Sequence, residues 1–69
     1  MYKYVIGYSL SANPGNHTVS FESSTEPDDA ALTAEANFSW SIVLGMSPSA
    51  KFEYIKCVNS EREVKWRPR

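Results

Sequence analysis

The fold depends on residues 25–48, TEPDDAALTAEANFSWSIVLGMSP, because this segment fits both a helix and a strand. The helix interpretation rests on its two ends. Thr25 can cap a first turn in which Pro27 is tolerated, and the carboxylates that follow favour the positive end of the helix dipole. Gly45 suits the left-handed position just after a helix, and Pro48 prevents its continuation. The alanines between these ends are good helix formers.

The strand interpretation rests on alternation in the second half of the segment. Over residues 34–46 an apolar side chain stands at every second position, which is the period of a half-buried strand. On a helix the same side chains spread over more than one side, so Trp40 or Leu44 should be partly exposed or meet a partner. The two ends favour a helix over residues 26–46, and a strand over residues 34–46 stays open as the alternative.

The residues before this segment predict a β-hairpin. Apolar and polar side chains alternate over residues 2–10 and again over residues 17–22, which is typical of two strands. Between them lies NPGN, residues 13–16, in which proline presets φ and Gly15 accepts a positive φ. The pattern therefore predicts two strands joined by a turn.

Two apolar runs follow the ambiguous segment. Residues 51–58 predict a third strand, and residues 63–67 predict either a short fourth strand or a tail that packs Trp66 alone. With a helix in the middle, the order predicts an α+β fold with three to four antiparallel strands and one helix across one face. With residues 34–46 as a strand, the fold is all-β. A chain of 69 residues has room for one domain, residues 1–69.

Composition excludes several classes of protein. A hydrophobic content of 42% argues against disorder, and no run reaches the roughly 18 apolar residues of a membrane helix. Residues 1–6 alternate and so lack the apolar core of a signal peptide. Cys57 is the only cysteine, which for so small a domain indicates a reducing compartment. We therefore expect a cytoplasmic protein with no membrane partner.

No motif predicts catalysis, a metal or a cofactor. His17 follows a turn, and Cys57 lies in an apolar run where it is expected to be a small core residue. One histidine and one cysteine do not supply a structural zinc site. The three glycines have no phosphate-binding spacing. We therefore expect a protein that is not an enzyme, with no metal site and no cofactor.

Charge is divided along the chain although the net charge is only −1. Residues 1–50 carry one lysine against five carboxylates, and residues 51–69 carry six cations against three carboxylates. Charge steers association, and an aromatic side chain can anchor it. The predicted partner-binding residues form an acidic and a basic patch: Asp28, Asp29 and Glu35, and Arg62, Lys65, Trp66 and Arg67.

Two other kinds of partner remain open. The basic C-terminal segment could bind nucleic acid, with its cations on phosphates and Trp66 stacked on a base. The carboxylates of Glu61 and Glu63 interrupt that segment, so a protein partner is favoured. A homodimer is the other alternative, because an exposed edge strand and an apolar helix end can pair two copies.

The arrangement over residues 17–58 resembles that of small phage-encoded host-takeover and anti-defence proteins. The features that carry the likeness are the returning strand of the hairpin, the DDAA start at residues 28–31, the stop between Gly45 and Pro48, and the FEYI strand at residues 52–55. The phage inhibitor of bacterial RNA polymerase and some anti-CRISPR proteins have this plan. The resemblance implies a non-enzymatic protein that binds and inhibits or modulates a larger complex of a bacterial host.

Overall fold

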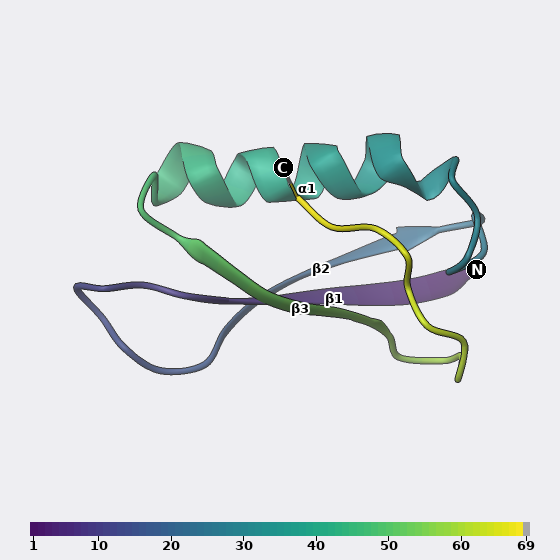
Figure 1. Cartoon of the computed structure of the whole chain (residues 1–69), viewed down its shortest axis with the longest axis horizontal. Helices are drawn as coiled ribbons and strands as arrows, with labels where there is room; N and C mark the ends of the chain where they lie inside the picture. The colour runs from purple at the N-terminus through teal and green to yellow at the C-terminus, as the bar shows by residue number, and fades with distance from the viewer. Residues whose placement is uncertain (69) are drawn as a thin grey trace.

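The structure is a computed structural model that describes residues 1–68; Arg69, at the end of the basic segment, lies outside them. Its elements are β1 (Tyr2–Ser9), β2 (His17–Ser23), α1 (Leu32–Met46) and β3 (Lys51–Cys57). The strands form an antiparallel sheet in the order β2-β1-β3, and α1 lies across one face of it (Figure 1). The predicted α+β fold is confirmed. The all-β alternative, with residues 34–46 as a strand, is wrong.

β1 is the central strand and has a different relation to each neighbour. It pairs with β2 over seven consecutive residues, from Tyr2 opposite Ser23 to Tyr8 opposite His17. The connecting turn has Gly15 at φ 146°, as the sequence predicts. The pairing of β1 with β3 shifts register after Gly7, so this second ladder contains a bulge.

The core lies between the sheet and a layer made of α1 and the C-terminal tail. Alternation along β1 turns Tyr4 and Ile6 toward that layer. The buried apolar side chains come from all parts of the chain except β2: Tyr4, Ile6, Leu32, Ala36, Trp40, Val43, Ile55, Cys57, Val64 and Trp66. β2 adds partly buried side chains to the edge of this core.

The helix begins at Leu32, about two turns later than predicted. Residues 26–31 form tight turns instead, with Asp29 N–H donating to Glu26 C=O at 3.1 Å. Thr25 does not cap the helix, since its hydroxyl donates to Glu35. Pro27 is buried and its carbonyl accepts the N–H of Lys65, so a contact across the chain holds this segment out of the helix.

The predicted end of the helix is also wrong in detail. Gly45 lies within α1, and Gly15 is the one residue with positive φ among residues 1–68. The helix ends at Met46, where the N–H of Ser47 still donates to Val43 C=O at 2.8 Å. Pro48 follows and prevents a further turn.

The tail after β3 contains no strand within the described residues. It turns at residue 59 and runs back toward α1 (Figure 1). Val64 and Trp66 are both buried in the core, so the tail packs Val64 as well as Trp66 and not Trp66 alone. Irregular backbone replaces the fourth strand.

Candidate functional site

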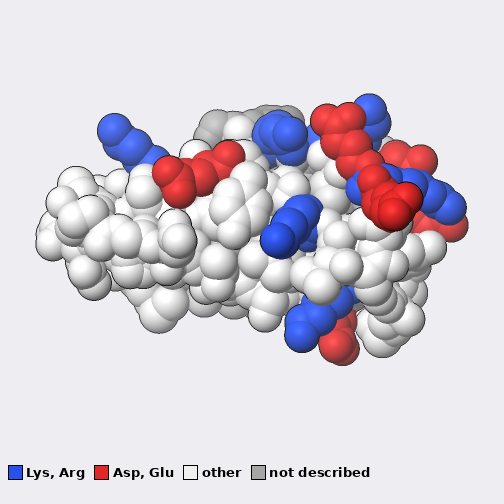
Figure 2. All heavy atoms as spheres, turned by 90° about the horizontal axis from the view of Figure 1, so that it is seen from below, with Lys and Arg blue, Asp and Glu red and all other residues white. Residues whose placement is uncertain are grey.

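The fold gathers charge at one end of the molecule. β2 ends, α1 begins and β3 ends on the same side, so the connections there bring together side chains distant in sequence. Figure 2 shows a cluster of charged groups of both signs near this end and further charged groups spread over the rest of the same face. We call this surface the charged end, and it consists of Glu26, Asp28, Asp29, Glu35, Arg62 and Lys65.

Arg62 joins the two predicted patches. Its Nη1 lies 3.0 Å from Glu26 Oε2 and 3.4 Å from Asp28 Oδ1. The hydrogen bond to Glu26, followed by the negative charges of Glu26 and Asp28, raises the pKa of Arg62 above its usual value. All three side chains are about half exposed, so the ion pairs add little to stability. They leave an exposed surface of mixed charge.

Asp29 and Glu35 shape the local backbone. The carboxylate of Asp29 accepts the N–H of Ala31 at 2.9 Å, which is an Asx turn at the entrance to α1. Glu35 Oε2 accepts the hydroxyls of Ser23 and Thr25. Both carboxylates therefore have a structural role at the junction of β2 with α1.

Trp66 belongs to the core. Its side chain is 5% exposed, its indole N–H donates to Asn37 Oδ1 at 2.7 Å, and its ring meets Phe52 edge to face at 5.6 Å. The sequence allowed for a buried Trp66, because the segment around it also fits a tail that packs against the core. Asn37, which receives the indole, was not predicted.

The other two basic residues of the predicted patch lie in different parts of the structure. Lys65 is exposed at the charged end, with Nζ 3.4 Å from a carboxylate oxygen of Glu63. Arg67 lies away from the charged end, over the ring of Phe52 at 5.9 Å. Its Nη1 donates to the carbonyls of Val64 and Trp66. The structure therefore brings Lys65, but not Arg67, close to Arg62 and to the acidic loop, which is residues 24–31 between β2 and α1.

A buried tyrosine holds the acidic loop to the sheet. The hydroxyl of Tyr4 donates to the carbonyl of Thr25. Burial raises the pKa of Tyr4 to about 12, since the phenolate would lose its hydration. The sequence predicts Tyr4 within a strand but gives no indication of this contact, which spans 21 residues.

His17 and Cys57 lie far apart. They stand opposite Tyr8 and Tyr4 of β1, which are four residues and about 13 Å apart along the strand. His17 Nε2 lies 2.8 Å from the carbonyl oxygen of Asn13, and Cys57 is buried with its thiol donating to Asn59. Each has a structural partner.

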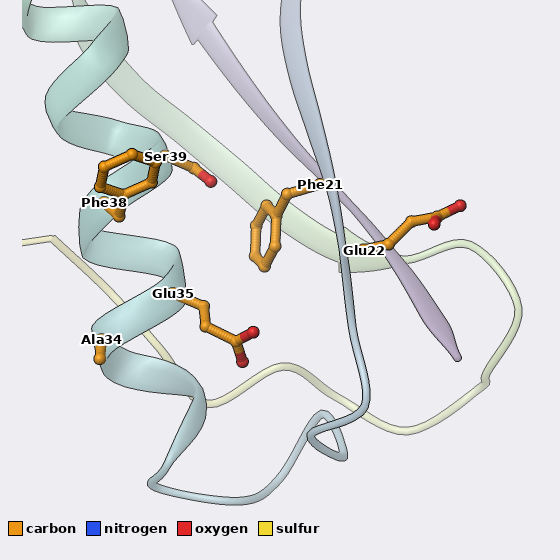
Figure 3. A pocket seen from close by; sticks show the side chains of 6 residues that line it. All are labelled: Phe21, Glu22, Ala34, Glu35, Phe38 and Ser39. Atoms are coloured by element: carbon orange, nitrogen blue, oxygen red, sulfur yellow. The ribbon is translucent and has the colours of Figure 1, made fainter.

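A second surface feature lies between α1 and β2. A shallow hollow of about 310 Å³ is lined by Phe21, Glu22, Ala34, Glu35, Phe38 and Ser39. In Figure 3 Phe21 reaches from β2 toward α1, whereas the carboxylate of Glu22 points away from the hollow.

An exposed apolar strip continues from the hollow along the helix. Phe38, Ile42 and Met46 are 67%, 45% and 73% exposed. Leu44 is half-buried, as expected for a helix with apolar residues on several sides, and Trp40 is buried.

Comparison with known proteins assigns no relative. No protein-family model, no curated protein and no solved structure matches this chain. Within residues 1–68 no helix is long and apolar enough to cross a membrane. No three His, Cys, Asp or Glu side chains of the same residues are grouped as a metal site would require.

Proposed function

We propose that this protein is a non-enzymatic interaction protein that binds a larger protein complex through its charged end and inhibits or modulates it. One observation supports this surface. Asp28 and Arg62, separated by 34 residues in sequence, lie together at an exposed end with Asp29 and Lys65 beside them. Exposed charges of both signs steer association and set orientation on a partner of complementary pattern.

The resemblance to phage host-takeover proteins extends this proposal to a bacterial host complex in the cytoplasm. It rests on architecture, which the strand, strand, helix, strand order of the chain shares. Proteins of this plan act by occupying a surface, for which an exposed charged end of a small domain is sufficient.

Nucleic acid is the weaker candidate. That alternative depended on an exposed indole to stack on a base, and Trp66 is buried. Arg62 and Lys65 each face a carboxylate of the same chain, which lowers the positive potential available to phosphates. A protein surface with its own charge pattern fits these paired groups better.

The test is affinity capture from bacterial lysate at two salt concentrations, with and without nuclease, followed by mass spectrometry. A charge-swapped variant, Glu26→Lys/Asp28→Lys/Arg62→Glu, keeps both pairs of opposite charges around position 62 but reverses the pattern that a partner meets. We expect one stoichiometric complex that survives nuclease and is lost with the swapped variant.

Glu53→Lys is the matched control, because Glu53 is exposed in β3 and lies outside the charged end. It should capture the same complex as the unmodified protein. Equal capture by the swapped variant would refute the charged end as the binding surface. Proteins that vanish with nuclease would instead establish nucleic acid as the partner.

A further inference from the structure

The two edges of the sheet are protected to different degrees. β3 carries Lys51 and Lys56 and contains the bulge, both of which discourage pairing with another strand. β2 pairs with β1 without interruption and contains no lysine, arginine or proline. An unprotected edge of this kind is a template for a further strand.

The backbone groups of this edge can be identified. Lys3 of β1 turns both its N–H and its C=O toward the β3 side, where they meet Asn59 and Val58. Because the direction alternates along a strand, Tyr4, Ile6 and Tyr8 point to β2 and are bonded to the residues opposite them. The backbone groups of the remaining β2 residues therefore face outward: Thr18, Ser20 and Glu22.

The apolar strip of α1 runs beside this edge. Glu35 contacts Ser23, and Phe38 lines the same hollow as Phe21, so α1 runs antiparallel to β2 along its flank. Phe38, Ile42 and Met46 recur at every fourth position and share one side of the helix. An incoming chain that paired with the edge of β2 would also meet this strip.

The outward edge of β2 and the apolar strip of α1 have their midpoints at the same level of the molecule, which makes the surface self-complementary. Phe21 matches Phe38 in position, and a step of one residue along β2 corresponds to about two residues along a helix. Ser20 therefore lies beside position 40, midway between Phe38 and Ile42. A twofold axis at Ser20 would pair β2 with its copy and place Phe38 against the second copy's Ile42.

Charge favours a second copy over a different partner. Two identical surfaces carry identical charges, so a patch of one sign would repel its own copy, whereas a patch without charge meets no such repulsion. Residues 4–21 and 36–50 contain no Asp, Glu, Lys or Arg, and they include the strip and most of the β2 edge. Glu22, at the end of the edge, would face the second copy's Thr18. Interface centres are depleted of charge in the same way.

We propose that two copies of this protein pair through β2, antiparallel about Ser20, to form a continuous six-stranded sheet with the apolar strips of α1 in contact. Scaling roughly 150–250 Å² per large side chain by the exposed fractions, the strip supplies roughly 300–450 Å² per copy. A standard interface takes about 800 Å² per partner, so the strand edges supply the rest and the dimer is of moderate affinity. This inference is independent of the proposed function, because the outward edge of β2 and the apolar strip contain none of the residues of the charged end.

Sedimentation equilibrium of the full chain, from about 5 to about 500 µM, tests the dimer. We expect a monomer–dimer equilibrium that weakens at least about tenfold in Ser20→Pro and in Ile42→Glu. Proline is tolerated at Ser20 because the N–H it removes faces outward. Thr33→Glu adds the same charge as Ile42→Glu on another exposed side of α1 and should leave the equilibrium unchanged. A monomer at every concentration, or a dimer that ignores both variants, would overturn the proposal.

The register has its own test in a Cys57→Ser background. Paired about Ser20, the two Ser20 Cα atoms lie about 5.5 Å apart, within disulfide range, whereas the two Thr18 residues are about 13 Å apart. Oxidation should therefore cross-link Ser20→Cys but not Thr18→Cys. Cross-linking of Thr18→Cys with equal efficiency would exclude this register. Circular dichroism of each variant confirms that a negative result does not come from unfolding.

Discussion

Replacing Trp66 by alanine separates a structural tail from a binding arm. The side chain is 5% exposed, contacts Phe52 and donates to Asn37, so the change leaves a cavity between the tail and the sheet. Deleting a buried tryptophan costs about 3–5 kcal/mol. A chain of 69 residues has a total free energy of unfolding of roughly 3–10 kcal/mol at roughly 0.05–0.15 kcal/mol per residue. Trp66→Ala should therefore remove at least about a third of the free energy of unfolding.

The assay is urea unfolding followed by far-ultraviolet circular dichroism, which does not depend on the removed indole. Lys65→Ala is the matched control, because that side chain is exposed and its backbone N–H, which donates to Pro27, is retained. The control should change the free energy of unfolding by less than about 0.5 kcal/mol. A loss below about 1 kcal/mol in Trp66→Ala would mean that the tail is not docked. Trp66 would then be available for binding, and its assignment to the core would be refuted.

Three further outcomes follow from individual contacts. In Gly7→Ala the new Cβ would collide with the ring of Tyr54, which lies across Gly7 on the outer face of the sheet. Urea unfolding should therefore show a loss of about 1–3 kcal/mol in the free energy of unfolding. Adding Tyr54→Ala in the same chain should largely restore it. Asp29→Ala removes the carboxylate that accepts the N–H of Ala31 in the turn before α1 and should cost about 1 kcal/mol in the same assay. The pKa of Tyr4 is raised from 10 to about 12. The contribution of its neutral phenol to the free energy of unfolding is therefore complete below pH 10 and is lost as the pH rises through 12. The loss should reach up to about 3 kcal/mol in pH-dependent unfolding, and it should be missing in Tyr4→Phe.

The sequence was sufficient for the elements because their signals are local. Alternation and the NPGN turn predict the hairpin, and a seven-residue ladder with Gly15 at positive φ confirms it. The helix was favoured over a strand on its alanines and its ends. Its actual start at Leu32 was out of reach, since Tyr4 and Lys65 fix the preceding loop from 21 and 38 residues away. Local propensity does not depend on such contacts between residues that are distant in sequence.

The candidate site was harder to predict for the same reason. Asp28 and Arg62 were placed in separate patches because nothing in the sequence shows that the end of β2 and the end of β3 share one side of the sheet. The role of Trp66 depends on Asn37, a polar partner on α1 that is 29 residues away in sequence. A tryptophan among cations fits a binding segment and a packed tail equally well until that partner is known.

The division of the molecule into a charged end and a neutral flank connects the two proposals. A twofold axis at Ser20 sets the two β2 strands antiparallel, so the charged ends, which lie beyond Ser23, point in opposite directions. A target with two suitably spaced copies of the binding site would then be held at both ends, and its apparent affinity would exceed that of one charged end. A target with one site would bind the dimer and the monomeric Ser20→Pro variant equally well per charged end. The proposed dimer would therefore set how strongly a target with several copies of the binding site is preferred over a target with one site, although it adds no contact with either target.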